Sequence, residues 1–262
     1  MTSSALPFAA IVDVSTGATR WALVAVVVTS TAVAAVVNVV GSLGQSWAVL
    51  RAAGRALLQL LVVALVIAAV LDSLPLTVAF LLLMVAVAGG TAARRLTHDR
   101  GGLWAVLAVV AGAAPAIALT VGTGLVPLKG VALVPIGGIL IGGAMTATVL
   151  AGRRCLDALV RRHGEYEAAL SIGLGPRDAA LLVARDDAAL ALVPGLDQTR
   201  TVGLVTLPGA FVGMLLGGAT PMEAAAVQLV VLVALLMVQS VAVLVVVELV
   251  ARGRLSEARR TH

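Results

Sequence analysis

The residues that could perform acid–base or metal chemistry are few in this chain. The three histidines and the single cysteine are His98, His163, His262 and Cys155. No two of them stand at the short spacing that is typical of a zinc site. Glu165 and Glu167 are separated by one residue, so on a helix they point to different faces and form no carboxylate pair. We therefore predict neither catalysis nor a bound metal.

Nucleotide binding is not predicted for this chain either. A phosphate-binding loop ends in lysine followed by serine or threonine. The only lysine, Lys129, is followed by Gly130. The net charge of +5 does not indicate nucleic-acid binding, because aromatic residues are only 3% of the chain and leave almost nothing to stack on bases.

The polar residues gather in an insert of about residues 152–200, for which the sequence predicts a helical hairpin. Gly173 is suited to the left-handed end of a short helix. Pro176 is suited to the first turn of the next helix. Pro194-Gly195 is expected to break that second helix, and Asp197 to cap the one that follows.

The elements that position these residues must be membrane-spanning helices. Hydrophobic residues make up 61% of the 262 residues and charged residues 12%, whereas soluble domains have about 45–50% and about 25%. Lipid cannot satisfy backbone polar groups, so each apolar run must be helical. Seven runs qualify or nearly qualify for the length of about 20 residues that crosses the ~30 Å hydrocarbon core. They are residues 21–40, 54–71, 76–90, 103–125, 131–150, 201–216 and 224–250. The predicted fold is an all-α integral membrane protein with a single domain over residues 1–262.

The arginines orient these helices. Of the 18 basic residues, all but Arg20 and Lys129 fall in one set of alternate loops. Cytoplasmic loops carry such an excess, so we predict an outside amino terminus, a cytoplasmic carboxyl terminus and a cytoplasmic insert. The only acid within the runs is Glu248, near the inner end of the last one, which argues against an intramembrane enzyme. No basic region precedes the first run, and a cleavable signal peptide is not predicted.

Glycines repeat at four-residue intervals within the fifth and sixth runs. They are Gly138 and Gly142 in the fifth, and Gly209, Gly213 and Gly217 in the sixth. This spacing lets helix backbones approach closely in lipid. Packing within the chain, a homodimer seam and a substrate path would each use it.

Polar side chains and one methionine within the runs form a candidate substrate path. They are Gln59, Met145, Thr146, Gln228 and Gln239. Because polar groups are costly in lipid, they either bond between helices or line a route for a polar substrate. Thr220 and Glu223 have a different explanation, since Thr-Pro-Met-Glu is the pattern of a capping box at a helix start.

One short motif within the insert indicates a function. Glu167-Ala168-Ala169, three further residues and Gly173 resemble the start of the EAA loop of ABC-transporter permeases. In that family the loop forms a coupling helix that docks into a separate ATPase. The motif alone also fits a plain solvated hairpin, and Val183-Ala184-Arg185 departs from the family's usual continuation.

A wider resemblance to one permease family supports the transport interpretation. The stretches that carry it are residues 54–60 (GRALLQL), 134–138 (VPIGG), 170–173 (LSIG) and 201–209 (TVGLVTLPG). They are similar, in order, to the FetB family of ABC permeases, which includes bacterial iron-export subunits and plant aluminium-tolerance relatives. One departure is Gly143, where relatives carry asparagine. If that amide holds substrate in relatives, the cargo here could differ.

The resemblance implies a permease of the cell inner or plasma membrane that dimerises and binds two copies of a separate ATPase. ATP and magnesium would be held by that ATPase, with no cofactor in this chain. The implied coupling residues are Glu167, Ala168, Ala169, Gly173, Pro176 and Arg177. Iron export is the implied transport, whereas the EAA-like loop is more typical of importers. A non-metal cargo, an importer and a membrane scaffold without transport are the alternatives.

Overall fold

The computed structural model describes residues 16–97 and 100–255. In these ranges the chain forms helices and no β-strand, which confirms the all-α prediction. The expectations for His98, for His262 with the last arginines, and for the amino-terminal leader concern residues outside the described ranges.

Six helices in the described ranges are long and apolar enough to cross a membrane. They are α1 (Gly17–Val40), α2 (Ser46–Asp72), α3 (Leu74–Leu96), the segment Gly101–Gly122 made by η1 (Arg100–Leu103) and α4 (Trp104–Gly122), α5 (Gly130–Arg161) and α10 (Pro221–Ala251). A helix rises about 1.5 Å per residue, so each is long enough for the ~30 Å core. The chain is therefore a multi-pass membrane protein.

The chain divides into two compact units, Met1–Ala69 and Val70–His262. The first contains α1 and most of α2, joined by a turn in which Ser42 and Gly44 have φ values of 51° and 69°. Every described residue of α1 is at least partly exposed, Trp21 to 75%. Such an apolar, unburied surface suits lipid rather than water.

The second unit has a core built from α3, α4, α5 and α10. Small side chains dominate their contacts: Ala92, Ala108, Ala144 and Ala242 are all fully buried. At Gly112 the approach is to backbone, since a Cβ there would lie 2.8 Å from the Val238 carbonyl oxygen. Small residues of this kind let helices pack closely where no hydrophobic effect drives them together.

The sixth apolar run differs from the single helix that we expected over residues 201–216. After residue 201 only α9 (Gly209–Leu216) is helical there, and at about 1.5 Å per residue its 8 residues cannot cross the membrane alone. A turn precedes it, in which Gly203 has a φ of 84° and Val205 N–H donates to the Thr201 carbonyl at 2.9 Å. Pro208 lies directly before α9, where it lacks a backbone donor.

Of two predictions about the segment before this turn, one is confirmed in part and one was wrong. The second helix of the insert ends before Pro194, but the chain continues as a further helix, α8 (Val193–Thr201), with Pro194 in its first turn, because proline needs no donor there. Asp197 is inside α8 and caps nothing; it accepts a bond from Arg200 at 3.4 Å. By contrast, the capping box of Thr220 and Glu223 at the start of α10 is confirmed.

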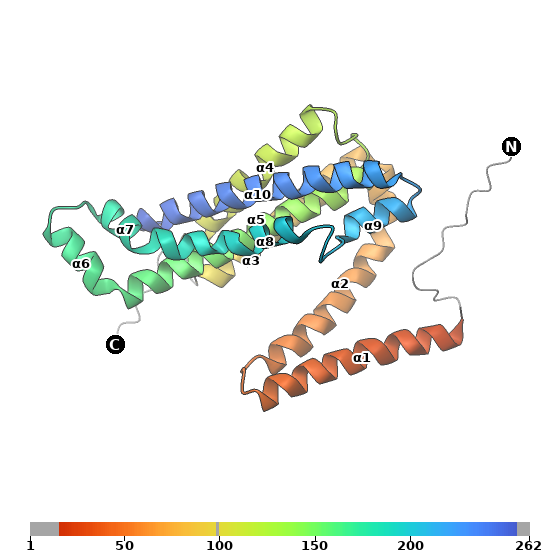
Figure 1. Cartoon of the computed structure of the whole chain (residues 1–262), viewed down its shortest axis with the longest axis horizontal. Helices are drawn as coiled ribbons and strands as arrows, with labels where there is room; N and C mark the ends of the chain where they lie inside the picture. Colours follow the sequence, from red (N-terminus) through yellow and green to blue (C-terminus); the bar gives the residue numbers. More distant parts are fainter. Residues whose placement is uncertain (1–15, 98–99, 256–262) are drawn as a thin grey trace. The chain divides into compact units, whose positions relative to one another are not determined.

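Helices α7 (Pro176–Ala189), η2 (Leu190–Leu192), α8 and α9 follow one another beside α10 (Figure 1). All four contact α10, and α7 and η2 also contact α5. Both α5, with 32 residues, and α10, with 31, are longer than the hydrocarbon core requires. Helix α7 packs against both of these long helices.

Candidate coupling site

The insert forms the helical hairpin that the sequence predicts. Helix α6 (His163–Ser171) ends just before Gly173, whose φ of 95° is left-handed. The next two amides close the end, with Gly173 N–H donating to the Leu170 carbonyl at 3.0 Å and Leu174 N–H to the Ala169 carbonyl at 3.1 Å. Pro176 then opens α7, as expected from its fixed φ.

The three residues of the EAA-like motif have different environments. Ala169 is 3% exposed, on the helix that packs against α7. Glu167 and Ala168 are exposed, and Glu167 lies 3.9 Å from His163. The motif therefore uses one alanine to hold the hairpin together and leaves the other two residues accessible to a partner.

Arg162, which sequence reasoning did not select, joins the two helices of the hairpin. Its Nε donates to Glu165 at 2.8 Å, and its Nη1 donates to the Val183 carbonyl in α7, also at 2.8 Å. Asp187 adds an ion pair at 3.7 Å. Hydrogen bonding to Glu165 raises the pKa of Arg162, and the same bond lowers the pKa of Glu165. The three-residue spacing of Arg162 and Glu165 was the available signal.

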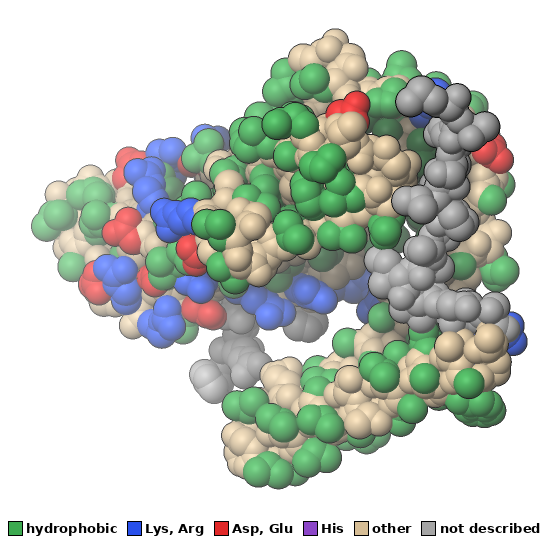
Figure 2. Space-filling view, turned by 45° about the vertical axis from the view of Figure 1, so that its right-hand side comes forward, with side chains coloured by type: hydrophobic (Ala, Val, Ile, Leu, Met, Phe, Trp, Pro, Cys, Tyr) green, Lys and Arg blue, Asp and Glu red, His purple; other side chains and the backbone are tan. Residues whose placement is uncertain are grey.

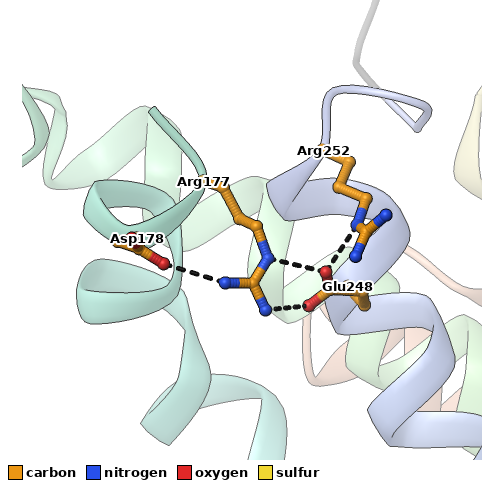
Figure 3. A network of polar contacts seen from close by, with 4 residues as sticks. All are labelled: Arg177, Asp178, Glu248 and Arg252. Carbon is orange, nitrogen blue, oxygen red and sulfur yellow. Dashed lines mark hydrogen bonds and ion pairs between the residues drawn. The ribbon is translucent and has the colours of Figure 1, made fainter. Parts of the chain in front are cut away.

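Arg177 connects the start of α7 to the end of α10 (Figure 3). Its Nε and Nη2 donate to the two carboxylate oxygens of Glu248 at 2.6 and 2.8 Å, and its Nη1 donates to Asp178 at 2.9 Å. Arg252 donates to the same carboxylate at 2.5 Å. The bonds to Glu248 raise the pKa of Arg177. We call these four residues the arginine–glutamate network.

A groove of about 800 Å³ opens beside this network. Its apolar wall includes Leu156, Leu159 and Val250, and its polar lining includes His163, Tyr166 and Arg177. Residues of α5, α6, α7 and α10 thus meet around one depression. Movement of the hairpin would change the shape of this groove and the contacts of α10 together.

Two residues of the candidate substrate path lie inside the second unit. Gln228 is 5% exposed, and its Oε1 has no hydrogen-bond partner among the described residues. Gln239 is half-buried with its Oε1 likewise unpaired, and its amide lies against Gly195 of α8. The buried Thr148, whose hydroxyl is also unpaired, was missed by sequence reasoning, which selected Thr146.

The other path residues are more exposed. Met145 packs partly buried against the core, whereas Thr146 is exposed. Gln59 is an exposed residue of α2 in the first unit. The structure therefore brings only part of the predicted set into the bundle interior.

The predicted packing glycines also divide. A Cβ at Gly138 would lie 3.0 Å from the Met84 side chain, so this glycine serves packing within the chain. At Gly142, Gly209 and Gly213 a Cβ would meet nothing within 4 Å among the described residues, and at Gly217 only the backbone of its own helix. The α9 glycines thus have no packing partner in the described part of the chain.

Metal-binding side chains do not cluster in the ranges that the structure describes, since no group of three or more His, Cys, Asp or Glu is found there. Cys155 is buried, with its Sγ 3.9 Å from the Ala184 carbonyl of α7. It acts as a small residue where α5 packs against the hairpin.

Comparison with known proteins gives a consistent set of relatives. The sequence model described as "Uncharacterised protein family (UPF0014)" matches residues 21–254. UPF0014 membrane protein STAR2 of Oryza sativa subsp. japonica is 36% identical over 72% of this chain and 68% of its own length. Protein ALUMINUM SENSITIVE 3 of Arabidopsis thaliana is 40% identical over 58% of this chain, a match that spans only 56% of that relative. Probable iron export permease protein FetB of Escherichia coli (strain K12) is 28% identical over 75% of this chain and 77% of its own length. No solved structure matches the chain.

Proposed function

Because this chain belongs to the UPF0014 family of membrane proteins, we propose that it is the membrane-spanning permease subunit of an ABC transporter. A separate ATPase subunit would bind the hairpin of α6 and α7 and supply ATP hydrolysis. The name of the FetB relative, an iron export permease, supports this class of function. The resemblance of Glu167 to Gly173 to the EAA loop supports the place of docking.

The observation that carries the proposal is the bond between Arg177 and Glu248, 71 positions apart in the chain. A hairpin that only folded on itself would not need to hold the last long helix. Exposed ion pairs contribute about 0–1 kcal/mol to stability, so stability alone does not account for a carboxylate shared by two arginines. A bidentate pair does fix relative orientation, which is what a mechanical link requires.

Movement of the hairpin would reach the centre of the bundle through α10. This helix packs on α4 and α5, and its buried residues include Gln228 and Val238. We propose that nucleotide-driven closure of the ATPases pulls on the hairpin and changes the packing of α10. Alternating access to a path near Gln228, Gln239 and Met145 would follow.

The proposed topology has seven crossings, with the amino terminus outside and the hairpin in the cytoplasm. Six crossings would be the long helices, and the seventh would be the broken column of α8 and α9. The contacts that α10 makes with α7, η2, α8 and α9 support this topology. Helix α7 bonds to the last turns of α10 at Glu248, whereas α9 comes directly before the first turn of α10 in the chain. Non-helical backbone is tolerated at membrane depth where protein covers it.

Iron is the cargo that we propose, because one relative is named as an iron export permease. The described residues contain no cluster of metal-ligating side chains that would form a binding site for iron. Iron would therefore pass as a chelate or through uncharged oxygen donors. A non-metal cargo, import rather than export, and a non-transporting scaffold are the competing functions. We also propose that the protein acts as a homodimer, with the open glycine face of α9 as the candidate seam.

The test is reconstitution of this chain in liposomes with the separate ATPase that we propose as its partner. Glu248→Gln removes the charge that holds Arg177 without changing the size of the side chain. We expect ATP hydrolysis to persist while iron transport falls about tenfold. A tenfold loss lies within the effects of about 5–150-fold that are typical of coupling between two sites. Arg200→Gln is the matched control, since Arg200 pairs only with Asp197 of its own helix in the described residues.

Unchanged transport in Glu248→Gln would contradict the mechanical link. Transport without the ATPase, or an ATPase that neither binds nor responds to the chain, would contradict the permease assignment. ATP-driven transport of another substrate in place of iron would correct the cargo alone.

A further inference from the structure

Two pairs of arginines lie at the end of α3 that packs beside α5. Arg94 and Arg95 are in the last turn of α3, and Arg153 and Arg154 are on α5. The Nε of Arg153 donates to the backbone carbonyl of Arg95 at 3.2 Å, so one residue of each pair is in direct contact with the other pair. We call these residues the arginine cluster.

No acidic side chain neutralises the positive charge of the arginine cluster within the part of the chain that the structure describes. Its arginines form no ion pair there, whereas Arg162, Arg177, Arg200 and Arg252 each pair with an acid. The acid one turn along α5, Asp157, makes no ion pair either, and Asp99 lies outside the described residues. The carboxyl end of α3 offsets only about half a charge. Several positive charges are therefore left facing outward.

The surroundings of the cluster suit the boundary between hydrocarbon and headgroups. Leu82, Leu83 and Val87 of α3 are 65%, 56% and 52% exposed. Arg94 follows Val87 by seven residues, or about 10 Å along the helix. At the start of α4, Trp104 is 41% exposed and Arg254 lies 5.2 Å from its ring centre. Tryptophan is enriched at this depth of a membrane.

We propose that the arginine cluster binds the phosphate headgroup of an anionic phospholipid, whose acyl chains lie along the exposed apolar face of α3. Guanidinium groups match phosphate in a bidentate geometry. Figure 2 shows Lys and Arg side chains, with Asp and Glu among them, over the end of this unit that carries the hairpin, with further Lys and Arg along the adjoining edge, while many hydrophobic side chains lie on the rest of the visible face. An acidic surface of the ATPase is a weaker candidate, because the exposed leucines and valine beside the cluster need an apolar occupant.

The experiment uses the full chain purified in a neutral detergent, with bound lipid measured by native mass spectrometry. Phosphatidylglycerol is titrated against phosphatidylcholine with the same acyl chains, and inorganic phosphate is added in a separate arm. We expect the anionic lipid to bind preferentially and Arg95→Gln/Arg153→Gln to weaken it about 25-fold, from about fivefold for each basic residue. Arg185→Gln is the control, because Arg185 is exposed on α7 and has no acidic partner among the described residues.

Arg95→Lys/Arg153→Lys keeps the charges and should retain most of the lipid affinity, and circular dichroism checks that each variant is folded. Equal binding of the two lipids, full displacement by millimolar phosphate, or unchanged lipid binding in the glutamine variant would each overturn the proposal. Loss of ATPase affinity with unchanged lipid binding would assign the cluster to the ATPase instead. The measurement is independent of transport, so its failure leaves the permease proposal untouched.

Discussion

At the scale of single residues, Arg162 contacts both helices of the hairpin. It lies between α5 and α6, and it is bonded to Glu165 of α6 and to the Val183 carbonyl of α7. Both helices are short, and isolated helices shorter than about 12–15 residues are marginal in water. Contacts between them must therefore supply the order that a coupling element needs.

We predict that Arg162→Gln increases amide hydrogen exchange severalfold over His163–Ser171, as measured by mass spectrometry. The substitution removes the charge that Glu165 and Asp187 share and the donor that reaches α7. Arg161→Gln is the neighbouring control, because Arg161 makes no ion pair among the described residues. Equal exchange in the two variants would show that Arg162 does not hold the hairpin.

The same contact predicts a pH dependence. Because hydrogen bonding to Arg162 lowers the pKa of Glu165 in the folded hairpin, the unfolded hairpin binds a proton at higher pH than the folded one. The stabilisation is complete above the ordinary glutamate pKa of about 4.3 and is lost as the pH falls through the lowered value. The protection of the hairpin amides, which is their exchange relative to the intrinsic rate at each pH, should fall on acidification below about pH 4, and Glu165→Gln should remove that dependence. A parent protein whose hairpin protection does not change with pH in this range would contradict the prediction.

Sequence reasoning identified part of the site at this scale. Gly173 and Pro176 could be predicted because their backbone preferences act locally, and the structure confirms both. Arg177 was selected through the EAA-like loop, but its partner Glu248 is 71 positions away and no spacing rule joins them. The signal was a lone acid at the end of an apolar run, since such a residue needs a partner.

At the scale of elements, hydropathy predicted the helices but not their interruptions. The run over residues 201–216 has no charged residue. Hydropathy averaged over such a run does not reveal a single left-handed glycine such as Gly203. Pro194 was misjudged for a related reason. Proline is compatible with the first turn of a helix and not with its interior, so its effect depends on where the helix starts.

Glycines that look equivalent in the sequence should respond differently to alanine. Gly112→Ala would bring a methyl group against the backbone of α10 at Val238, which cannot move as a side chain can. We expect it to destabilise the bundle by about 1–3 kcal/mol through overpacking. Gly142→Ala meets nothing within 4 Å in the described residues and should be neutral or stabilise by up to about 1 kcal/mol. Thermal unfolding in detergent compares the two, and equal midpoints would contradict the packing described for α4 and α10.

At the scale of the whole molecule, family membership was available from the sequence because short motifs keep their order along the chain. The class of fold could also be predicted from the sequence, because lipid requires every backbone polar group to be hydrogen-bonded within the protein and few structures achieve this. The number of crossings stays a prediction, because it depends on whether the broken column of α8 and α9 traverses the membrane. Charge counting favours seven, since an insert and a carboxyl terminus that are both rich in arginine would both be cytoplasmic, with an even number of crossings between them.

Cysteine labelling in intact cells distinguishes six crossings from seven. In a Cys155→Ala background, Ala219→Cys lies between α9 and α10 and Arg254→Cys lies just after α10. Seven crossings with an outside amino terminus predict that an impermeant maleimide labels position 219 and not position 254, because the first is outside and the second is cytoplasmic. Six crossings would reverse both results, since α10 would then run in the opposite direction. Thr123→Cys, in the turn after α4, is the control and should be labelled in either case, whereas Ser171→Cys in the hairpin should react only after the cells are opened.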